Sequence, residues 1–402
     1  MRLTGPATAG VIAGEPVQVW VTATVPAGAA AGHHAGAIEV RAAGGACVEI
    51  YVGVTVLPLA LREPRQERFL WYRGTIDCAQ PQHRVPEDVF CSQLADIRSH
   101  GFTAISLNER RPALVRRAAR LAREAGFAGT VVLHAPVPAG ITPADFGGLR
   151  PVVYVSDEID VRGEEWHDGH RRNLAGAAGL GLPTMASIAD AGFLPRLAEL
   201  GPVPDVVSVY LPRSREFVAG RVGGVYYHWA AHMEKPNVHR VLAGFYLWKS
   251  GAAGIAPYCY QHLPVHPNSP YDDFDDWEPG FVIGGTADDY KDHLATYPAR
   301  TGVVPTLQWE GMGEGITDLR YVTTVDELLV AADAVAGPKA EECVKVRATL
   351  DELAAAISLT AVDVASETST EPYPHLTGGD LSRFRARLAS HALALQAIAG
   401  DR

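Results

Sequence analysis

Short apolar runs alternate with amphipathic stretches between about residues 65 and 335, and this alternation is the dominant pattern in the chain. Continuous β-branched runs are typical of buried parallel strands, and apolar residues spaced three or four apart are typical of the helices that cover them. The expected strands are 69–72, 104–107, 130–134, 152–156, 184–187, 205–210, 224–227 and 254–258, with helices such as 87–99 and 112–125 between them. This pattern predicts the α/β class and a TIM-type (β/α)8 barrel over residues 65–335. A doubly wound open sheet is the alternative, but no GxGxxG motif follows a strand and opens a helix.

The segments on either side of this region have different patterns. Residues 1–60 alternate with period two, most clearly over 16–25, 37–41 and 48–56, which predicts a small β-sandwich-like module. A complete immunoglobulin-like sandwich needs about 100 residues, so this module is either minimal or truncated. Residues 338–402 contain two Ala- and Leu-rich amphipathic stretches, 340–357 and 381–398. They predict a C-terminal helical segment that serves packing or oligomerisation.

Composition and charge narrow the range of partners. The chain has 402 residues, of which 47% are hydrophobic and 20% charged, as is typical of a soluble globular protein. Its net charge of −11 argues against nucleic acid or an anionic membrane as a partner. The N-terminus lacks the apolar core of a signal peptide, so the cytoplasm is the expected location, with secretion as the alternative. Five scattered cysteines form no CxxC pair, and we expect neither a metal nor a cofactor.

Two adjacent carboxylates, Asp157 and Glu158, follow the fourth expected barrel strand. Catalytic groups of such barrels stand at the C-terminal ends of the strands. Two acids at this position suit general acid–base chemistry on a leaving group, with one acid protonated and the other ionised. The alternative is a surface turn, because Asp and Glu are mostly exposed.

Polar and aromatic side chains gather at the ends of the other expected strands as well. They are Trp71, Arg73, Asn108, Glu109, His134, Ser187, Tyr210, Tyr227, Trp229, Tyr258, Tyr260 and Gln261. Carbohydrate sites combine flat aromatic rings with planar donors and acceptors, because sugars present apolar faces ringed by hydroxyls. The repetition of these residues along successive strands favours a sugar-binding pocket. For any single aromatic residue, a place in the core is the alternative.

Two further segments resemble glycoside hydrolase family 123. Residues 297–321 are similar to its C-terminal barrel signature, approximately YP…G..PT.RWE..REG..D.RYL, although Gln308 and Gly313 stand where that signature often has Arg. Residues 240–254 resemble its R…WK.G..G segment, and the adjacent carboxylates resemble its catalytic pair. The alternative for these segments is architectural, with Glu310 and Asp318 tying a loop to the barrel and Arg240 in a buried ion pair.

The resemblance implies an exo-acting, retaining β-N-acetylgalactosaminidase that uses substrate-assisted catalysis on a terminal β-linked N-acetylgalactosamine. The acetamido oxygen of the substrate attacks the anomeric carbon and forms an oxazoline, while Glu158 protonates the glycosidic oxygen and Asp157 orients the acetamido N–H. Both acids reach one site only if the strand ends at Ser156 and the backbone turns, since consecutive strand residues face opposite sides. The expected substrate-binding residues are Arg73, Asn108 and His134 for ring hydroxyls, Tyr210, Tyr227 or Tyr258 for the acetamido oxygen, and Trp229 or Trp248 for stacking under the sugar.

Two other functions are compatible with the same residues. One is hydrolysis of a different glycoside by the same carboxylate pair, and the other is carbohydrate binding without catalysis. The sequence leaves open the aglycone, the choice between galacto and gluco sugars, and the oligomeric state.

Overall fold

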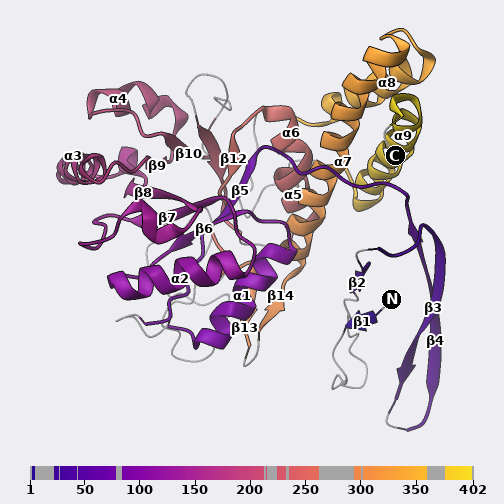
Figure 1. The fold of residues 1–402 in the computed structure, drawn as a ribbon, viewed down its shortest axis with the longest axis horizontal. Coiled ribbons are helices and arrows are strands. Elements are labelled where there is room, and N and C mark those ends of the chain that lie inside the picture. The colour runs from indigo at the N-terminus through magenta and orange to yellow at the C-terminus, as the bar shows by residue number, and fades with distance from the viewer. Residues whose placement is uncertain are drawn as a thin grey trace, which may run out of the picture. The chain divides into compact units, whose positions relative to one another are not determined.

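The structure is a computed structural model, which describes residues 2–4, 22–26, 28–42, 44–77, 84–211, 214, 224–231, 235–261, 294–299, 302–359 and 376–400. The chain divides into two compact units, which are Met1–Ala60 and Leu61–Arg402. The second unit holds the barrel and the C-terminal helices (Figure 1).

Eight parallel strands form a closed barrel in the second unit. In chain order they are β5 (Glu67–Leu70), β6 (Ala104–Leu107), β7 (Thr130–His134), β8 (Arg150–Ser156), β9 (Thr184–Ile188), β10 (Val206–Tyr210), β11 (Val225–His228) and β12 (Gly254–Ile255). Neighbours in the sequence are neighbours in the barrel, and β12 pairs with β5 to close it. The predicted TIM-type barrel is confirmed, and each expected strand overlaps an observed one.

Alternate strand residues fill the interior of the barrel. One core cluster joins inward-facing side chains from all around the ring, among them Phe69, Val132, Val152 and Met185. Below them, Glu67 accepts hydrogen bonds from the Thr130 backbone N–H and hydroxyl at 2.7 Å each, from Arg150 Nη2 at 2.8 Å and from the Tyr226 hydroxyl. A paired polar cluster therefore occupies the N-terminal end of the barrel.

Helices cover the outside of the barrel (Figure 1). They are α1 (Glu87–Ser99), α2 (Pro112–Glu124), α3 (Glu164–Gly179), α4 (Leu194–Glu199), α5 (Pro236–Val241) and α6 (Leu247–Ser250), with a π-helical segment, Leu242–Tyr246, joining the last two. The buried residues of α2 are Val115, Ala118, Ala119, Leu121 and Ala122, which form one helical stripe against the strands.

The long helix α7 (Leu307–Ala336) follows a hairpin of β13 (Thr296–Pro298) and β14 (Val303–Pro305). It crosses α5 and the π-helical segment at small residues. A Cβ atom at Gly315 would lie 2.2 Å from the Arg240 carbonyl oxygen, and one at Gly244 would lie 2.5 Å from the Gly315 carbonyl oxygen. The glycines near the start of α7 therefore allow two helix backbones to touch.

A buried ion pair reinforces this crossing. Asp318, which is fully buried, accepts from Arg240 Nε at 2.6 Å and Nη2 at 3.2 Å, and from Arg385 Nε at 2.6 Å. Arg240 is therefore a structural ion-pair partner in this fold, which agrees with the architectural interpretation of its segment.

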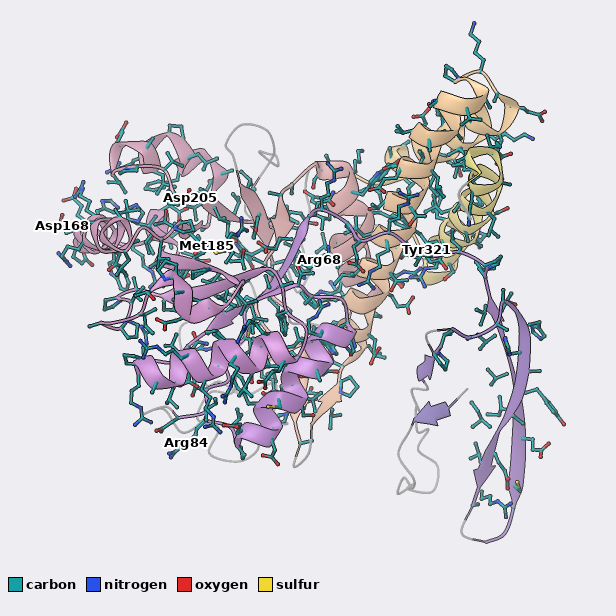
Figure 2. All side chains as sticks on the ribbon, in the orientation of Figure 1. Arg68, Arg84, Asp168, Met185, Asp205 and Tyr321 are labelled. Carbon is teal, nitrogen blue, oxygen red and sulfur yellow. The ribbon has the colours of Figure 1, made fainter. Side chains whose placement is uncertain are left out.

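The C-terminal helices α8 (Glu341–Ala356) and α9 (Gly378–Ala399) pack against α7. Arg385 of α9 lies over the ring of Tyr321, a residue of α7 labelled in Figure 2, at 6.0 Å. Lys249 of α6 donates to the carbonyl oxygens of Ala354 and Ile357 at the end of α8, at 2.7 and 2.5 Å. The tail is thus bound to the outer helices of the barrel, as a packing role predicts.

The described part of the first unit consists of two antiparallel sheets of two strands each. They are β1 (Arg2–Thr4) with β2 (Thr22–Thr24), and β3 (Gly32–Arg41) with β4 (Cys47–Val56). Residues 16–21 of the expected first strand lie outside the described residues, so the sandwich stays a prediction. Among the helices that the structure describes, none has the length and apolar character needed to cross a membrane.

Candidate active site

The backbone turns sharply where β8 ends. The pairing of β8 with β9 shifts register between Tyr154 and Ser156, and β8 ends at Ser156. Glu158 then adopts the left-handed conformation, with φ 40° and ψ 51°, and it is the only described residue other than glycine with a positive φ. A left-handed non-glycine residue is uncommon and marks a position that the surrounding structure determines. This is the turn that the adjacent carboxylates require to share one site.

The Asp157 carboxylate is held by two hydroxyl groups. Its Oδ1 accepts from the Tyr154 hydroxyl at 2.6 Å and from Ser187 Oγ at 3.1 Å, and the two hydroxyls also contact each other. Burial raises the pKa of Tyr154 well above its ordinary value, and the charge of Asp157 adds to this shift, so the phenol remains a donor. The other oxygen, Oδ2, lies 3.6 Å from Arg162 Nη2. Asp157 therefore has a fixed oxygen and a more open one, and 58% of its side chain is exposed.

The Glu158 side chain lies near the end of β11. Its backbone N–H donates to Ser187 Oγ at 2.9 Å, so the same serine contacts both acidic residues. Its Oε1 lies 4.0 Å from Nε2 of His228, at the end of β11. The Glu158 side chain is 34% exposed, which makes it the less solvated of the two acids.

Five of the predicted substrate-binding residues lie at the C-terminal ends of the barrel strands, around the carboxylates. Arg73 donates from Nη1 to the Tyr258 hydroxyl at 2.6 Å, and Asn108 donates from Nδ2 to the Tyr72 carbonyl oxygen at 2.6 Å. Tyr210 stacks on His228 with ring centroids 5.2 Å apart. The fifth residue is His134.

His134 packs beside two inward-facing aromatic rings. Its ring centroid lies 5.8 Å from that of Trp71 and 5.3 Å from that of Tyr154. Burial, with the nearby charges of Arg110 and Arg73, lowers the pKa of His134 to about 4. The imidazole is therefore neutral near pH 7 and offers one donor and one acceptor.

The other three predicted substrate-binding residues lie outside the barrel, among its outer helices. Tyr227 is fully buried outside the barrel and donates its hydroxyl to the Leu242 carbonyl oxygen at 2.6 Å. Trp229 is also fully buried, and its Nε1 donates to His239 Nδ1 of α5 at 2.9 Å. Trp248 lies on α6, where its Nε1 donates to Asp326 of α7 at 2.8 Å. All three belong to the packing between the barrel and its outer helices, so they are not part of the site.

The alternation of strand residues explains two of these errors and reveals what the sequence interpretation missed. Tyr226 and His228 of β11 face the interior of the barrel, so Tyr227 between them faces the helices. Tyr210 pairs in register with His228. An inward-facing Tyr210 therefore implies an inward-facing His228 beside it. The sequence also did not predict the contact of Tyr154 with Asp157, because Tyr154 lies within an apolar strand and was expected in the core.

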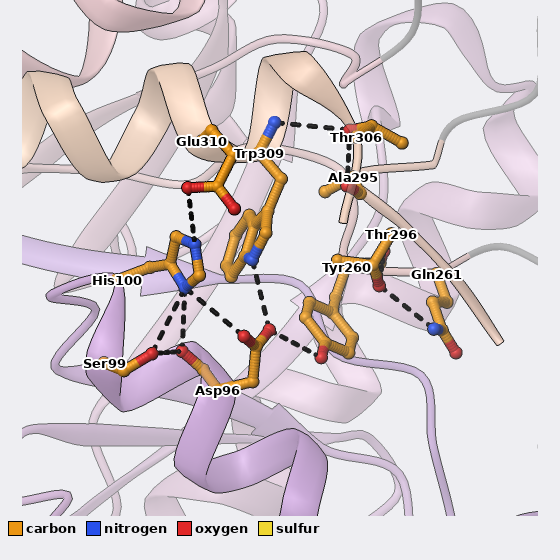
Figure 3. Close-up of polar contacts among 10 residues, drawn as sticks. All are labelled: Asp96, Ser99, His100, Tyr260, Gln261, Ala295, Thr296, Thr306, Trp309 and Glu310. Atoms are coloured by element: carbon orange, nitrogen blue, oxygen red, sulfur yellow. Dashed lines mark hydrogen bonds and ion pairs between the residues drawn. The ribbon is translucent and has the colours of Figure 1, made fainter. Parts of the chain in front are cut away.

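The signature segment at the start of α7 forms a partly buried network with α1 and Tyr260 (Figure 3). Trp309 Nε1 and the Tyr260 hydroxyl both donate to Asp96 Oδ2 of α1, at 3.1 and 2.9 Å. His100 lies between Asp96 and Glu310, with Nε2 3.7 Å from Glu310 Oε2. Burial raises the pKa of Asp96. In the structure this segment therefore fastens α7 to α1, in agreement with its architectural interpretation.

The described residues contain no group of three or more His, Cys, Asp or Glu side chains placed to hold a metal ion.

Comparisons with known proteins gave only distant structural similarity. No family model and no curated protein matches the sequence. Among solved structures, the chain is similar to the β-glucuronidase from Ruminococcus gnavus in complex with D-glucuronic acid, with 9% identity and a TM-score of 0.38 over 70% of this chain and 55% of that one. The complex of that enzyme with D-glucaro 1,5-lactone gives 10% identity and a TM-score of 0.38, over 70% and 56%. The chain thus spans about half the length of these proteins.

Proposed function

We propose that this chain is a glycoside hydrolase, and more specifically an exo-acting, retaining β-N-acetylgalactosaminidase that uses substrate-assisted catalysis. The observation that carries the proposal is the left-handed turn at Glu158, which brings two consecutive carboxylates to the C-terminal end of the barrel. The resemblance of the carboxylate pair to that of glycoside hydrolase family 123 supports the choice of sugar.

Adjacent carboxylates suit substrate assistance better than attack by a protein nucleophile. In the usual retaining mechanism, two carboxyl groups flank the scissile bond about 5–5.5 Å apart, one of them attacking the anomeric carbon. When the acetamido oxygen of the substrate attacks instead, the protein needs one acid and one group that orients the acetamide. Asp157 fits the second role, because its Oδ1 is held by Tyr154 and Ser187 while Oδ2 is open to accept the acetamido N–H. Its charge would stabilise the positive charge that develops on the oxazolinium ring.

Glu158 fits the role of the acid. It would donate its proton to the glycosidic oxygen as that bond breaks, and the aglycone would leave as the alcohol. Water would then attack the anomeric carbon of the oxazoline, giving its proton to Glu158 and restoring the acetamide. The lower exposure of Glu158 suits a group that must be protonated when substrate binds.

The surrounding residues supply the contacts that a sugar needs. Tyr258, oriented by Arg73, and Tyr210 are the candidate donors to the acetamido oxygen. Asn108 and the neutral His134 are the candidate contacts to ring hydroxyls.

Hydrolysis of nitrophenyl glycosides tests the proposal. The panel is the β-N-acetylgalactosaminide, its gluco epimer, the β-galactoside and the β-glucuronide, each assayed with the wild type, Glu158→Gln and Asp157→Asn. We expect activity on the acetamido sugars alone, a loss of about 10²–10⁴-fold in Glu158→Gln, and tight inhibition by a thiazoline analogue of the intermediate.

Other outcomes distinguish the alternatives. Activity on the β-galactoside or β-glucuronide without thiazoline inhibition would contradict substrate assistance and indicate a different glycoside. Binding of sugars without turnover would indicate a carbohydrate-binding protein.

A further inference from the structure

We propose that His228, fixed by Ser208, is a positioning residue for Glu158. It would hold the Glu158 carboxyl group through a hydrogen bond from Nε2 to one oxygen when substrate binds, leaving the other oxygen to carry the proton. The kinetic part of this inference rests on the proposed function, but its structural part does not.

Two contacts fix the His228 ring. Ser208 Oγ lies 2.8 Å from His228 Nδ1, and Ser208 is fully buried inside the barrel. The ring of Tyr210 stacks on the imidazole with an interplanar angle of 26°. The His228 side chain is only 9% exposed, so it has little freedom to leave this position. A histidine held at one nitrogen and along one face presents its other nitrogen in a defined direction.

That direction is toward Glu158. Nε2 lies 4.0 Å from Glu158 Oε1, which is longer than a hydrogen bond. Hydrogen bonds between catalytic groups are often long in the absence of substrate and tighten in the complex. The one-third of the Glu158 side chain that is exposed leaves the carboxylate room to close this distance.

The serine selects the imidazole tautomer. A hydroxyl has one proton to donate, and donation from Ser208 to Nδ1 leaves the proton of a neutral imidazole on Nε2. This Nε2–H then faces the carboxylate as a donor. In the opposite tautomer, two unprotonated acceptors would face each other whenever Glu158 is ionised. The Nε2–H tautomer is therefore the one in which both contacts are favourable while Glu158 is ionised.

Ionisable groups on neighbouring elements accompany this pair. The turn after β8 contributes Asp157, which Arg162 accompanies at 3.6 Å, and β10 contributes Tyr210. Beyond β12, Tyr258 follows the residues that pair with β11. Glu158 Oε1 lies 4.0 Å from His228 Nε2, so a donor at Nε2 acts on that carboxyl group.

The test compares two substitutions of His228. His228→Phe keeps a flat ring but removes the donor, whereas His228→Gln retains an amide donor close to the position of Nε2. On the substrate that the wild type hydrolyses, we expect His228→Phe to lower kcat about 10- to 100-fold with KM changed less than threefold. The basic limb of its pH–rate profile should move to higher pH, because the ionised carboxylate has lost a donor. His228→Gln should recover most of kcat.

His391 provides a matched control on the C-terminal helices. Its Nδ1 lies 2.8 Å from Glu342 Oε1 and its Nε2 lies 3.0 Å from Thr349 Oγ1, so it has the same kinds of partner. His391→Phe should leave kcat and the pH–rate profile unchanged. A wild-type profile in His228→Phe, or no recovery in His228→Gln, would overturn the inference.

A measurement on the wild type does not depend on activity or on the folding of a variant. Nitrogen-15 NMR of histidine side chains should show the His228 proton on Nε2 at pH 8, with Nδ1 unprotonated, and its signals should shift in Glu158→Gln. A proton on Nδ1 would overturn the inference even if no glycoside is hydrolysed. The absence of hydrolysis with the expected tautomer would instead count against the proposed function alone.

Discussion

Replacing Tyr154 with Phe removes one of the two donors that hold Asp157 and leaves the rest of the side chain in place. The ring of Tyr154 packs edge-to-face on Trp71, with centroids 4.7 Å apart, and Phe preserves this contact. The lost interactions are the 2.6 Å hydrogen bond from the hydroxyl to Asp157 Oδ1 and the contact of the same hydroxyl with Ser187 Oγ. The substitution therefore tests the hydroxyl groups that orient one oxygen of Asp157.

The expected magnitude follows from the strength of that bond. A hydrogen bond to a charged group contributes about 1.5–3 kcal/mol. If all of it is expressed in the transition state, kcat/KM falls by about 10- to 150-fold, since about 1.4 kcal/mol is a factor of ten. Ser187 remains within reach of Oδ1 at 3.1 Å and can direct its single proton there. We therefore expect the lower part of this range, about 10- to 30-fold.

A double-mutant cycle sharpens this expectation. Ser187→Ala alone should also be compensated in part, by Tyr154, whereas the double variant leaves Oδ1 without either donor. The loss in the double variant should therefore exceed the product of the two single losses. The assay is kcat/KM for hydrolysis of the nitrophenyl glycoside that the wild type turns over.

Tyr227→Phe is the control for this series. Tyr227 is another buried tyrosine with a 2.6 Å hydrogen bond, but its partner is the Leu242 carbonyl oxygen in the outer layer. It should change kcat/KM less than twofold while lowering the free energy of unfolding by about 0.5–1.5 kcal/mol. A Tyr154→Phe enzyme as active as Tyr227→Phe would refute the reasoning about Asp157.

Three further predictions concern stability. Gly315→Ala should lower the free energy of unfolding by about 1–3 kcal/mol in urea titrations, because its Cβ would meet the Arg240 carbonyl oxygen. Gly176→Ala, with open space around it, should raise the free energy of unfolding by about 0.5–1 kcal/mol. Equal effects of the two substitutions would show that the helix crossing tolerates a side chain. Asp318→Asn should lower the same quantity by about 3–5 kcal/mol by leaving buried Arg240 without its counter-charge, and a loss below about 1 kcal/mol would contradict the ion-pair assignment. Burial lowers the pKa of His170 to about 4, so the unfolded chain binds the proton more readily and stability falls as the pH drops from about 6.5 toward 4. Between pH 7 and pH 5 this group should remove about 2 kcal/mol, a component that His170→Asn should lack when unfolding is followed at both pH values.

The barrel could be predicted because its strands are buried on both faces. Runs such as 130–134 and 152–156 are nearly continuous in β-branched residues, and the structure places strands there. Asp157 and Glu158 could be placed at a strand end for the same reason. The turn that directs both side chains to one site could be stated as a requirement. Its position could not be predicted, because no residue type in this segment signals a left-handed conformation at Glu158.

Side-chain direction was harder to predict than position. Tyr227 and Trp229 stand at the end of a strand, yet they face the helices, while His228 between them faces the barrel. Burial on both faces removes the polar–apolar alternation that normally distinguishes the sides of a strand, so only the pairing with β10 reveals the inward side. The predicted stacking role of Trp248 was wrong for another reason. Trp248 belongs to a helix, and its partner on α7 is distant in the sequence.

The same limit applies to the signature around Trp309. Its tryptophan, acids and glycines could serve a site or a helix crossing, and composition alone does not separate the two. Only the partners decide, and those partners are Asp96 on α1 and Arg240 on α5.

The network around Asp96 has a consequence for how the chain folds during synthesis. Asp96 belongs to the first helix of the barrel, but its donors Tyr260 and Trp309 follow 164 and 213 residues later. At the usual pace of a ribosome, about 5–20 residues per second, the wait for Trp309 is about 10–40 s. Throughout that time the nascent chain carries an acidic residue on the helical surface that α7 will later cover. The contact between α1 and α7 therefore forms only late in translation. A chain released before Trp309 is synthesised would leave this surface of α1 exposed to chaperones and proteases.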